Sequence, residues 1–154
     1  MRDSFFLDSN VLIYGFSGRE PDKQRIAREL SDSDGAWVST QVLSEVGNVL
    51  IRKFGFPVGD ARARVASIAA GCDVVALTPA LILDAFRIAE RYRLGLYDAQ
   101  IVAAALACGA RRLFTEDMHH GLSVDGLELV SPFASRAREP SARYRARTKL
   151  RRAA

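Results

Sequence analysis

Short apolar runs of strand length alternate with longer segments of helical periodicity along this chain. The runs lie at residues 5–7, 37–38, 74–77 and 112–114, with a fifth candidate at 127–130. Strands that are separated by helices pair in parallel, and the connecting helices then cover both faces of the sheet. The pattern therefore predicts a three-layer α/β/α fold around a central, mostly parallel sheet of four to five strands.

Proline, glycine and small hydroxyl residues mark the ends of the helical segments. Residues suited to helix starts are Pro21, Ser39, Thr40 and Thr78, and residues suited to helix ends are Gly71, Gly95 and Gly109. Asp98 lies at the start of the last apolar helical segment. We therefore expect helices at residues 21–31, 40–53, 58–70, 79–93 and 98–108.

Acidic and basic residues are distributed unevenly over the 154 residues. Residues 1–133 carry 14 Lys and Arg against 17 Asp and Glu, a net charge of −3, and their apolar content suffices for one packed core. Residues 134–154 carry 8 against 1, a net charge of +7. We expect one domain at 1–133 and a basic C-terminal tail at 134–154, which is either an electrostatic arm for phosphates or only a solvated terminus.

The chain shows no signal for a membrane. No apolar run reaches the roughly 18 to 20 residues that a spanning helix needs, because Asp8, Ser9 and Asn10 interrupt the only candidate. The N-terminus also lacks the basic start and small-residue cleavage site of a signal peptide. We therefore expect a cytoplasmic protein with no membrane partner.

Four acidic residues lie in apolar surroundings, where an ionised side chain is costly unless it finds a partner. They are Asp8 after the first strand, Glu45 in the helix after the second strand, Asp98 at a helix start, and Asp117 after the fourth strand. Sites in open parallel sheets form beyond the carboxyl ends of the strands. The predicted fold would therefore bring these acids to one edge of the sheet.

Each acid taken alone has a structural alternative. Asp8 suits the cap of a short helix that follows it, and Asp98 suits the cap of its own helix. Asp117 suits a turn that ends at Gly121, and Glu45 suits a surface position from which its side chain reaches solvent. Four acids together favour a cation site, because two carboxylates roughly 4 Å apart repel by about 4 kcal/mol at an effective dielectric constant of about 20. Mg²⁺ or Mn²⁺ suits such an all-oxygen set.

Four segments resemble, in order and spacing, the motifs of PIN-domain nucleases, especially the VapC-type ribonuclease toxins of bacterial toxin–antitoxin pairs. The segments are residues 7–12 (LDSNVL), 44–46 (SEV), 96–105 (LYDAQIVAAA) and 113–118 (LFTEDM). The resemblance covers about residues 3–131. It rests on the ordered set, because any one of these motifs alone occurs by chance.

The resemblance implies a metal-dependent endoribonuclease with a PIN-like fold. Its Mg²⁺ or Mn²⁺ would be held by the four acids, Asp8, Glu45, Asp98 and Asp117. The site would activate water to cut RNA and leave a 5′-phosphate and a 3′-hydroxyl. The family also implies a cognate antitoxin protein that occludes the acidic pocket. We expect a homodimer as well, and the apolar stripes of residues 20–31 and 40–70 suit a dimer or antitoxin surface.

Other residues of the motifs have supporting roles by the same resemblance. Asn10 and Thr115 would orient the acids through hydrogen bonds, and Glu116 would be an outer ligand or only a turn residue. Substrate-binding residues are not assigned, because basic helix faces are more often only solvated. Adjacent His119 and His120 do not suit a tetrahedral zinc site, since no cysteine pair accompanies them.

Two other functions stay open at this point. A haloacid-dehalogenase-like phosphatase also begins with an aspartate after its first strand and uses magnesium, but it needs a second aspartate where this chain has Asn10. A non-catalytic PIN-like module would keep the fold and would bind RNA or a partner protein through the basic tail.

Overall fold

The computed structural model describes residues 3–134, so the predicted basic tail lies, apart from its first residue, outside the described residues. The elements in chain order are β1 (Phe5–Leu7), α1 (Ser9–Ile13), η1 (Tyr14–Phe16), α2 (Pro21–Ser31), β2 (Ala36–Ser39), α3 (Thr40–Arg52), α4 (Val58–Gly71), β3 (Asp73–Val75), α5 (Pro79–Tyr92), α6 (Leu96–Ala107), β4 (Arg112–Phe114), β5 (Ser123–Val124) and β6 (Leu127–Val130). Every predicted strand and helix is present, with ends shifted by a few residues at most.

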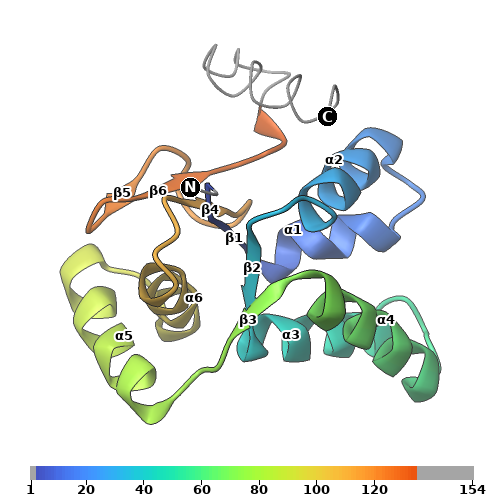
Figure 1. Cartoon of the computed structure of the whole chain (residues 1–154), viewed down its shortest axis with the longest axis horizontal. Coiled ribbons are helices and arrows are strands. Elements are labelled where there is room, and N and C mark those ends of the chain that lie inside the picture. Colours follow the sequence, from blue (N-terminus) through green and yellow to red (C-terminus); the bar gives the residue numbers. More distant parts are fainter. Residues whose placement is uncertain (1–2, 135–154) are drawn as a thin grey trace.

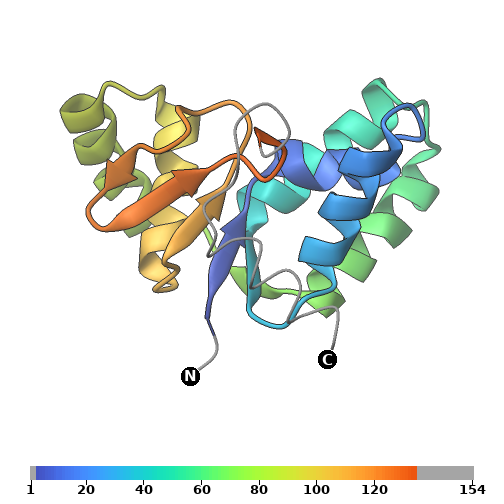
Figure 2. The same ribbon diagram turned by 90° about the horizontal axis from the view of Figure 1, so that it is seen from above.

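The strands form one sheet of six in the order β3-β2-β1-β4-β6-β5. All neighbours pair in parallel except β5 and β6. Helices α1 to α4 lie on one side of the sheet and α5 and α6 on the other (Figure 1), and the view from above shows the sheet between these two groups (Figure 2). The predicted three-layer α/β/α fold is confirmed, with one short strand more than expected.

The additional strand, β5, belongs to a tight hairpin. Its residues Ser123 and Val124 pair with β6, and only Asp125 and Gly126 connect the two strands. Both connecting residues have positive φ, 47° at Asp125 and 89° at Gly126, which is the pattern of a type I′ turn. The Asp-Gly pair is a strong hairpin signal, and it was the sequence feature that would have predicted β5.

The boundary between α5 and α6 differs from the prediction. Arg93 ends α5 in the left-handed conformation, with φ of 54°, where a glycine was expected to end the helix. Gly95 has φ of −61° and instead precedes α6, which begins at Leu96. Asp98 is therefore in the first turn of α6 and is not its cap, so the structural alternative of a capping Asp98 is wrong.

The core fills both sides of the sheet. All three residues of β1 are buried, as expected for a central parallel strand covered on both faces. The α6 helix is buried at every position from 99 to 105, including Gln100. This burial fixes the start of α6 against the sheet edge where the acids lie. Among the described residues, no helix is long and apolar enough to cross a membrane.

Candidate functional site

Asp8 lies directly after β1 and is only 4% exposed. Its side chain caps α1 by accepting the backbone N–H of Ser9 at 2.7 Å, so the capping interpretation of this acid is correct. Its other oxygen, Oδ2, accepts the hydroxyl of Thr115 at 2.9 Å and lies 3.4 Å from Nδ2 of Asn10. The cap and the hydrogen bonds together fix the orientation of the carboxylate.

Asn10 and Thr115 connect the ends of two neighbouring strands. The backbone N–H of Asp8 donates to the carbonyl of Phe114, which extends the pairing of β1 with β4. Thr115 follows β4 and is 1% exposed. Oδ1 of Asn10 accepts the backbone N–H of Glu116 at 3.2 Å. Both residues therefore lie against Asp8, where the resemblance puts them.

Glu45 projects from α3 and is held at both carboxylate oxygens. Oε2 accepts the hydroxyl of Ser9 at 2.5 Å, and Oε1 accepts Nε2 of Gln41 at 2.8 Å. Gln41 in turn accepts Nε2 of Gln100 at 3.0 Å and donates to the carbonyl of Tyr97 at 3.2 Å. Glu45 is thus part of a hydrogen-bonded network between α1, α3 and α6, and does not simply extend into solvent.

The three polar residues around Glu45 were not predicted from the sequence. Ser9 is adjacent to Asp8 in the sequence. Gln41 precedes Glu45 by four residues, so the side chains of Gln41 and Glu45 lie on one face of the same helix. Those spacings were the available signals for Ser9 and Gln41. Gln100 had no such signal, because its partner comes from another helix.

Asp98 and Asp117 complete the acidic group. Asp98 is half-buried in the first turn of α6, and Asp117 is exposed in the loop after β4. Burial raises the pKa of Asp98, and the negative charges of Asp117 and Glu45 raise it further. Both other acids therefore disfavour the charged form of Asp98.

Asp8 is coupled to the same group. Burial raises its pKa from 3.8 to about 6, the hydrogen bonds from Thr115 and the Ser9 backbone oppose that rise, and the charges of Glu45 and Asp98 add to it. Asp8, Glu45, Asp98 and Asp117 therefore form one electrostatically coupled set, here called the acidic cluster. Within residues 3–134, however, no three His, Cys, Asp or Glu side chains converge tightly enough to form a ready metal-binding group.

The chemistry of the donor set fits a hard divalent cation. The acidic cluster offers only carboxylate oxygens, which are the ligands that Mg²⁺ and Mn²⁺ prefer. Mutual repulsion and burial disfavour the charged form of Asp8 and Asp98, and a cation between the oxygens relieves both effects. Asp8, Glu45, Asp98 and Asp117 are the residues that could hold the ion.

The carboxylate of Glu116 pairs with a cation of α2. Its Oε1 lies 3.1 Å from Nζ of Lys23 in α2, and Lys23 also approaches the hydroxyl of Tyr14 at 3.4 Å. Glu116 thus forms an ion pair that was not predicted from the sequence. His119 and His120 are exposed, and Nδ1 of His120 accepts the backbone N–H of Ser131 at 2.9 Å.

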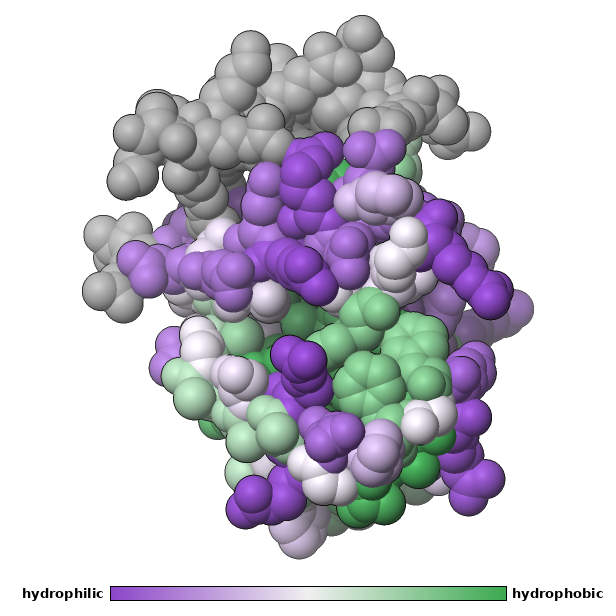
Figure 3. Space-filling view, turned by 90° about the vertical axis from the view of Figure 1, so that its right-hand side faces the viewer, coloured by the Kyte–Doolittle hydropathy of each residue, from purple (hydrophilic) through white to green (hydrophobic). Residues whose placement is uncertain are grey.

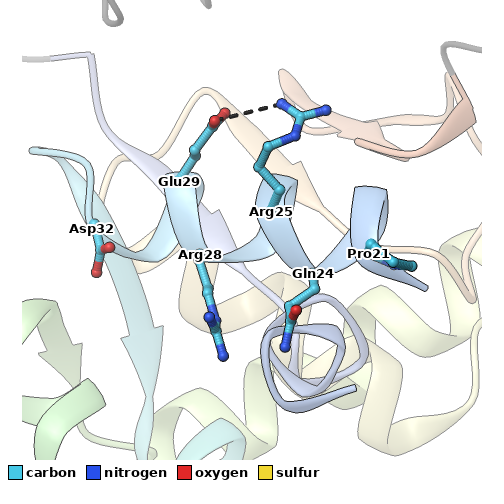
Figure 4. A pocket seen from close by; sticks show the side chains of 6 residues that line it. All are labelled: Pro21, Gln24, Arg25, Arg28, Glu29 and Asp32. Atoms are coloured by element: carbon cyan, nitrogen blue, oxygen red, sulfur yellow. Dashed lines mark hydrogen bonds and ion pairs between the residues drawn. The ribbon is translucent and has the colours of Figure 1, made fainter. Parts of the chain in front are cut away.

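A hollow on the surface of α2 lies apart from this chemistry. Its lining residues are Pro21, Gln24, Arg25, Arg28, Glu29 and Asp32. Figure 4 shows that they follow one another along α2, with Arg25 paired to Glu29. None of the lining residues belongs to the acidic cluster, so we assign no function to this hollow.

Comparison with known proteins gives matches to one family and to several solved structures. The sequence model of the family described as PIN domain matches residues 5–120. A toxin–antitoxin complex from Klebsiella pneumoniae has a TM-score of 0.64 at 23% identity, covering 84% of this chain and 98% of that chain. No curated protein sequence matches the chain.

Two further structures show the same likeness. VapC20 from Mycobacterium tuberculosis, described as a toxin that cleaves the sarcin-ricin loop, has a TM-score of 0.60 at 21% identity, covering 74% of this chain and 90% of its own. VapBC2 from Rickettsia felis, bound to a DNA fragment from its promoter, has a TM-score of 0.60 at 14% identity, covering 82% and 97%. At these identities the likeness concerns the fold.

Proposed function

The chain belongs to the PIN-domain family, and on this premise we propose that it is a Mg²⁺- or Mn²⁺-dependent endoribonuclease that hydrolyses RNA phosphodiester bonds. We also propose that it acts in the cytoplasm as the toxin of a toxin–antitoxin pair. The similar structures support this second step, since they include a toxin–antitoxin complex and a toxin that cleaves the sarcin-ricin loop.

One observation carries the proposal, namely the gathering of the acidic cluster, in which the hydroxyl of Ser9 is hydrogen-bonded to the carboxylates of both Asp8 and Glu45. Its members come from four separate segments, and the charges of Glu45 and Asp98 add to the rise in the pKa of Asp8. Perturbed acids gathered at the carboxyl edge of a parallel sheet are typical of a functional site. Acids with a purely structural role would not be expected to lie close together, because repulsion between their like charges lowers the stability of the fold.

Each acid has a role in the proposed site. Asp8, Asp98 and Asp117 would hold the ion through their carboxylate oxygens, and Glu45 would hold it as well or orient the attacking water. When bound, the ion supplies positive charge that acidifies water and neutralises charge on the phosphate.

Hydrogen bonds from uncharged groups orient the carboxylates for metal binding. Thr115 and the backbone N–H of Ser9 donate to the two oxygens of Asp8, which favours its ionised form and so favours metal binding. The hydroxyl of Ser9 and the amide of Gln41 fix the two oxygens of Glu45. Both acids are therefore oriented before a substrate arrives.

Asn10 argues against the phosphatase alternative. A haloacid-dehalogenase-like enzyme needs a carboxylate at this position, and this chain has an amide there. Both ends of that amide are engaged, since its nitrogen lies 3.4 Å from Asp8 and its oxygen accepts the backbone N–H of Glu116. Asn10 thus serves to orient the loop and Asp8.

We propose that the antitoxin covers an aromatic patch at the junction of α3 and α4. Phe54 packs near Phe56, and Phe56 contacts Phe16 of η1. Ile51 and Val58 extend the patch, and Val58 is 69% exposed. Figure 3 shows apolar side chains gathered on this face of the molecule, with hydrophilic side chains around them. Phe54→Asp should abolish the complex with co-expressed antitoxin and leave RNA cleavage unchanged.

For the interface of a homodimer, we propose the exposed apolar face of α5. Leu83 and Phe86 are 70% and 55% exposed and lie one helical turn apart, so they form an apolar face without cover from the described chain. Apolar stripes were expected at residues 20–31 and 40–70. The first of these, which corresponds to α2, includes no pair of large exposed apolar residues. If a second copy packs here, Leu83→Ser with Phe86→Ser should shift the molar mass in light scattering from dimer to monomer.

Cleavage of labelled RNA with and without Mg²⁺ tests the proposed activity. Asp8→Asn and Asp98→Asn should each lower the rate by at least about 100-fold, because each removes a ligand charge from the cluster. Glu90→Gln is the matched control, since Glu90 is an exposed acid on α5 outside the cluster. It should cleave at the wild-type rate.

Two outcomes would contradict the proposal. Mg²⁺-dependent cleavage that survives both substitutions would reject the assignment of these residues. Phosphatase activity toward a phosphomonoester, without RNA cleavage, would favour the haloacid-dehalogenase-like alternative.

A further inference from the structure

Tyr97 is an exposed aromatic residue beside the acidic cluster. It lies in the first turn of α6, directly before Asp98, and it is 74% exposed. Among residues 3–134, no other large apolar residue is so accessible to solvent. Apolar area that stays in water contributes nothing to hydrophobic stabilisation, so the ring of Tyr97 does little for the fold and is available to a ligand.

The backbone of Tyr97 is held by the network that also holds Glu45. Nε2 of Gln41 donates both to the carbonyl of Tyr97 at 3.2 Å and to Oε1 of Glu45 at 2.8 Å. The side-chain oxygen of Gln41 in turn accepts Nε2 of buried Gln100 at 3.0 Å. One nitrogen atom therefore connects the aromatic residue to a carboxylate of the acidic cluster.

The burial of α6 fixes this position against the rest of the fold. Every residue from 99 to 105 is buried, and Tyr97 and Asp98 share the turn just before them. A tyrosine side chain has only two rotatable bonds, so little conformational entropy is lost when a ligand packs on its ring. Tyr97 is therefore a preorganised surface next to one of the four acids.

The charge of the described residues favours a ligand contact that does not depend on charge. Residues 3–134 carry 13 Lys and Arg against 17 Asp and Glu, a net charge of −4. RNA binding by phosphate contacts depends on cations that release counterions, so this part of the chain attracts phosphates only weakly on average. A base that stacks on an aromatic ring needs no opposite charge, and every base has a face for stacking.

We propose that Tyr97 is a substrate-binding residue, on whose ring an unpaired base of the RNA stacks beside the phosphodiester that the acidic cluster cuts. The bases of a duplex stack on one another and offer no free face, so the substrate is RNA that is single-stranded at the site. The inference rests on the proposed function for the identity of the ligand, and it adds a contact residue and a class of substrate.

RNA binding measured without cleavage tests this role. The full chain carries Asp8→Asn, is kept in EDTA and serves as the parent, and its affinity for a labelled single-stranded RNA is followed by fluorescence anisotropy. Tyr97→Ala should weaken binding at least about 5-fold, because one stacked base is lost. Tyr97→Phe and Tyr97→Trp keep a ring and should bind within about 2-fold of the parent. Tyr97→Leu keeps an apolar side chain without a ring and should bind as weakly as Tyr97→Ala.

Ligands without free base faces separate stacking from other contacts. A duplex RNA, and an oligomer of the same length that lacks its bases, should bind Tyr97→Ala as tightly as they bind the parent. Because stacking releases no counterions, the slope of log affinity against log salt should not change in Tyr97→Ala. Phe54→Ala is the matched control, since Phe54 is an exposed aromatic residue between α3 and α4. It should bind single-stranded RNA as tightly as the parent.

Several results would overturn the proposal. They are a parent that does not bind single-stranded RNA, unchanged affinity in Tyr97→Ala, an equal loss in Phe54→Ala, and an equal loss with the base-free oligomer. Loss of a dimer or of the antitoxin complex without a change in RNA affinity would also overturn it, because Tyr97 would then belong to a protein interface.

The failure of this inference is distinguishable from the failure of the proposed function. Ring-dependent RNA binding by a chain whose wild-type form does not cleave RNA would support stacking on Tyr97 and reject the proposed nuclease. Cleavage of RNA by the wild type, with Tyr97→Ala binding RNA as tightly as the parent, would support the nuclease and reject the role of Tyr97.

Discussion

At the scale of single residues, Asp8 balances opposing effects. Burial raises its pKa, and the hydrogen bonds from Thr115 and Ser9 lower it, but burial dominates and the pKa reaches about 6. Without a cation, the folded protein at neutral pH must keep this carboxylate ionised in a site that disfavours the charge. Asp8 therefore reduces the stability of the metal-free protein.

We expect Asp8→Asn to stabilise the metal-free protein above pH 7 and to have little effect near pH 4. The folded chain binds this proton more tightly than the unfolded chain, so the contribution of Asp8 to stability falls as pH rises from 3.8 to about 6. The full shift in the pKa of Asp8 corresponds to about 3 kcal/mol of unfolding free energy at most. Asn at this position removes the charge and can still cap α1.

Urea unfolding in EDTA at both pH values measures this difference. Glu90→Gln, an exposed acid on α5, should show no such dependence on pH. Equal free energies of unfolding for Asp8→Asn and the wild type at neutral pH would contradict this account of Asp8.

Lys23 is a positioning residue for the loop after β4. Its ion pair with Glu116 is partly exposed and adds little to stability, but Glu116 lies between Thr115 and Asp117. We expect Lys23→Met to weaken Mn²⁺ binding about 10-fold, as loss of an outer partner of a metal site does, and Lys23→Arg to restore part of it. Mn²⁺ titration followed by electron paramagnetic resonance measures both.

Lys53→Met is the control for Lys23→Met, because Lys53 is an exposed cation at the end of α3. It should leave Mn²⁺ affinity unchanged. If Lys23→Met binds Mn²⁺ as tightly as the wild type, Lys23 does not position the loop.

The four acids were selected from the sequence because ionisable residues inside apolar runs are unusual, and their joint role as metal ligands stays a prediction. Asn10 and Thr115 followed from the motif resemblance. Lys23 and Gln100 were not predictable, since their partners come from distant segments and a Lys on an amphipathic helix is most often solvated. The electrostatic partners of the acids depend on tertiary contacts that no local pattern records.

At the scale of elements, the hydroxyl residues that cap two of the helices were predictable. Ser39 and Thr78 cap α3 and α5 through side-chain hydrogen bonds to Val42 and Leu81, as their positions indicated. The end of α5 was predicted to within one residue, but Arg93 takes the left-handed conformation that a glycine was expected to supply.

The Asp125-Gly126 turn gives a prediction at the element scale. Gly126 has φ of 89°, and an added Cβ would meet nothing within 4 Å, so Gly126→Ala introduces conformational strain without a clash. We expect it to destabilise the protein by about 1 kcal/mol. Gly59→Ala is the control, because Gly59 lies in α4 with equally open space, and it should be neutral or slightly stabilising. Urea unfolding that gives equal free energies for the two variants would contradict the type I′ assignment.

At the scale of the whole molecule, the layers were predictable and the order of the strands was not. Alternation of strands and helices indicates parallel pairing and two covering layers. It does not say that β1 lies between β2 and β4, which is the arrangement that brings Asp8 next to Thr115 and close to α3. Nor does it fix how near the carboxylates approach one another, because that depends on rotamers and on a bound cation.

We propose that Asp8, Glu45, Asp98 and Asp117 form one cation site. Crystals soaked in Mn²⁺ and measured for anomalous scattering test it most directly. We expect an anomalous peak bound by the carboxylates of Asp8 and Asp98, and we expect its loss in crystals of Asp8→Asn. Carboxylates that point to separate regions of the surface, with no Mn²⁺ between them, would contradict it.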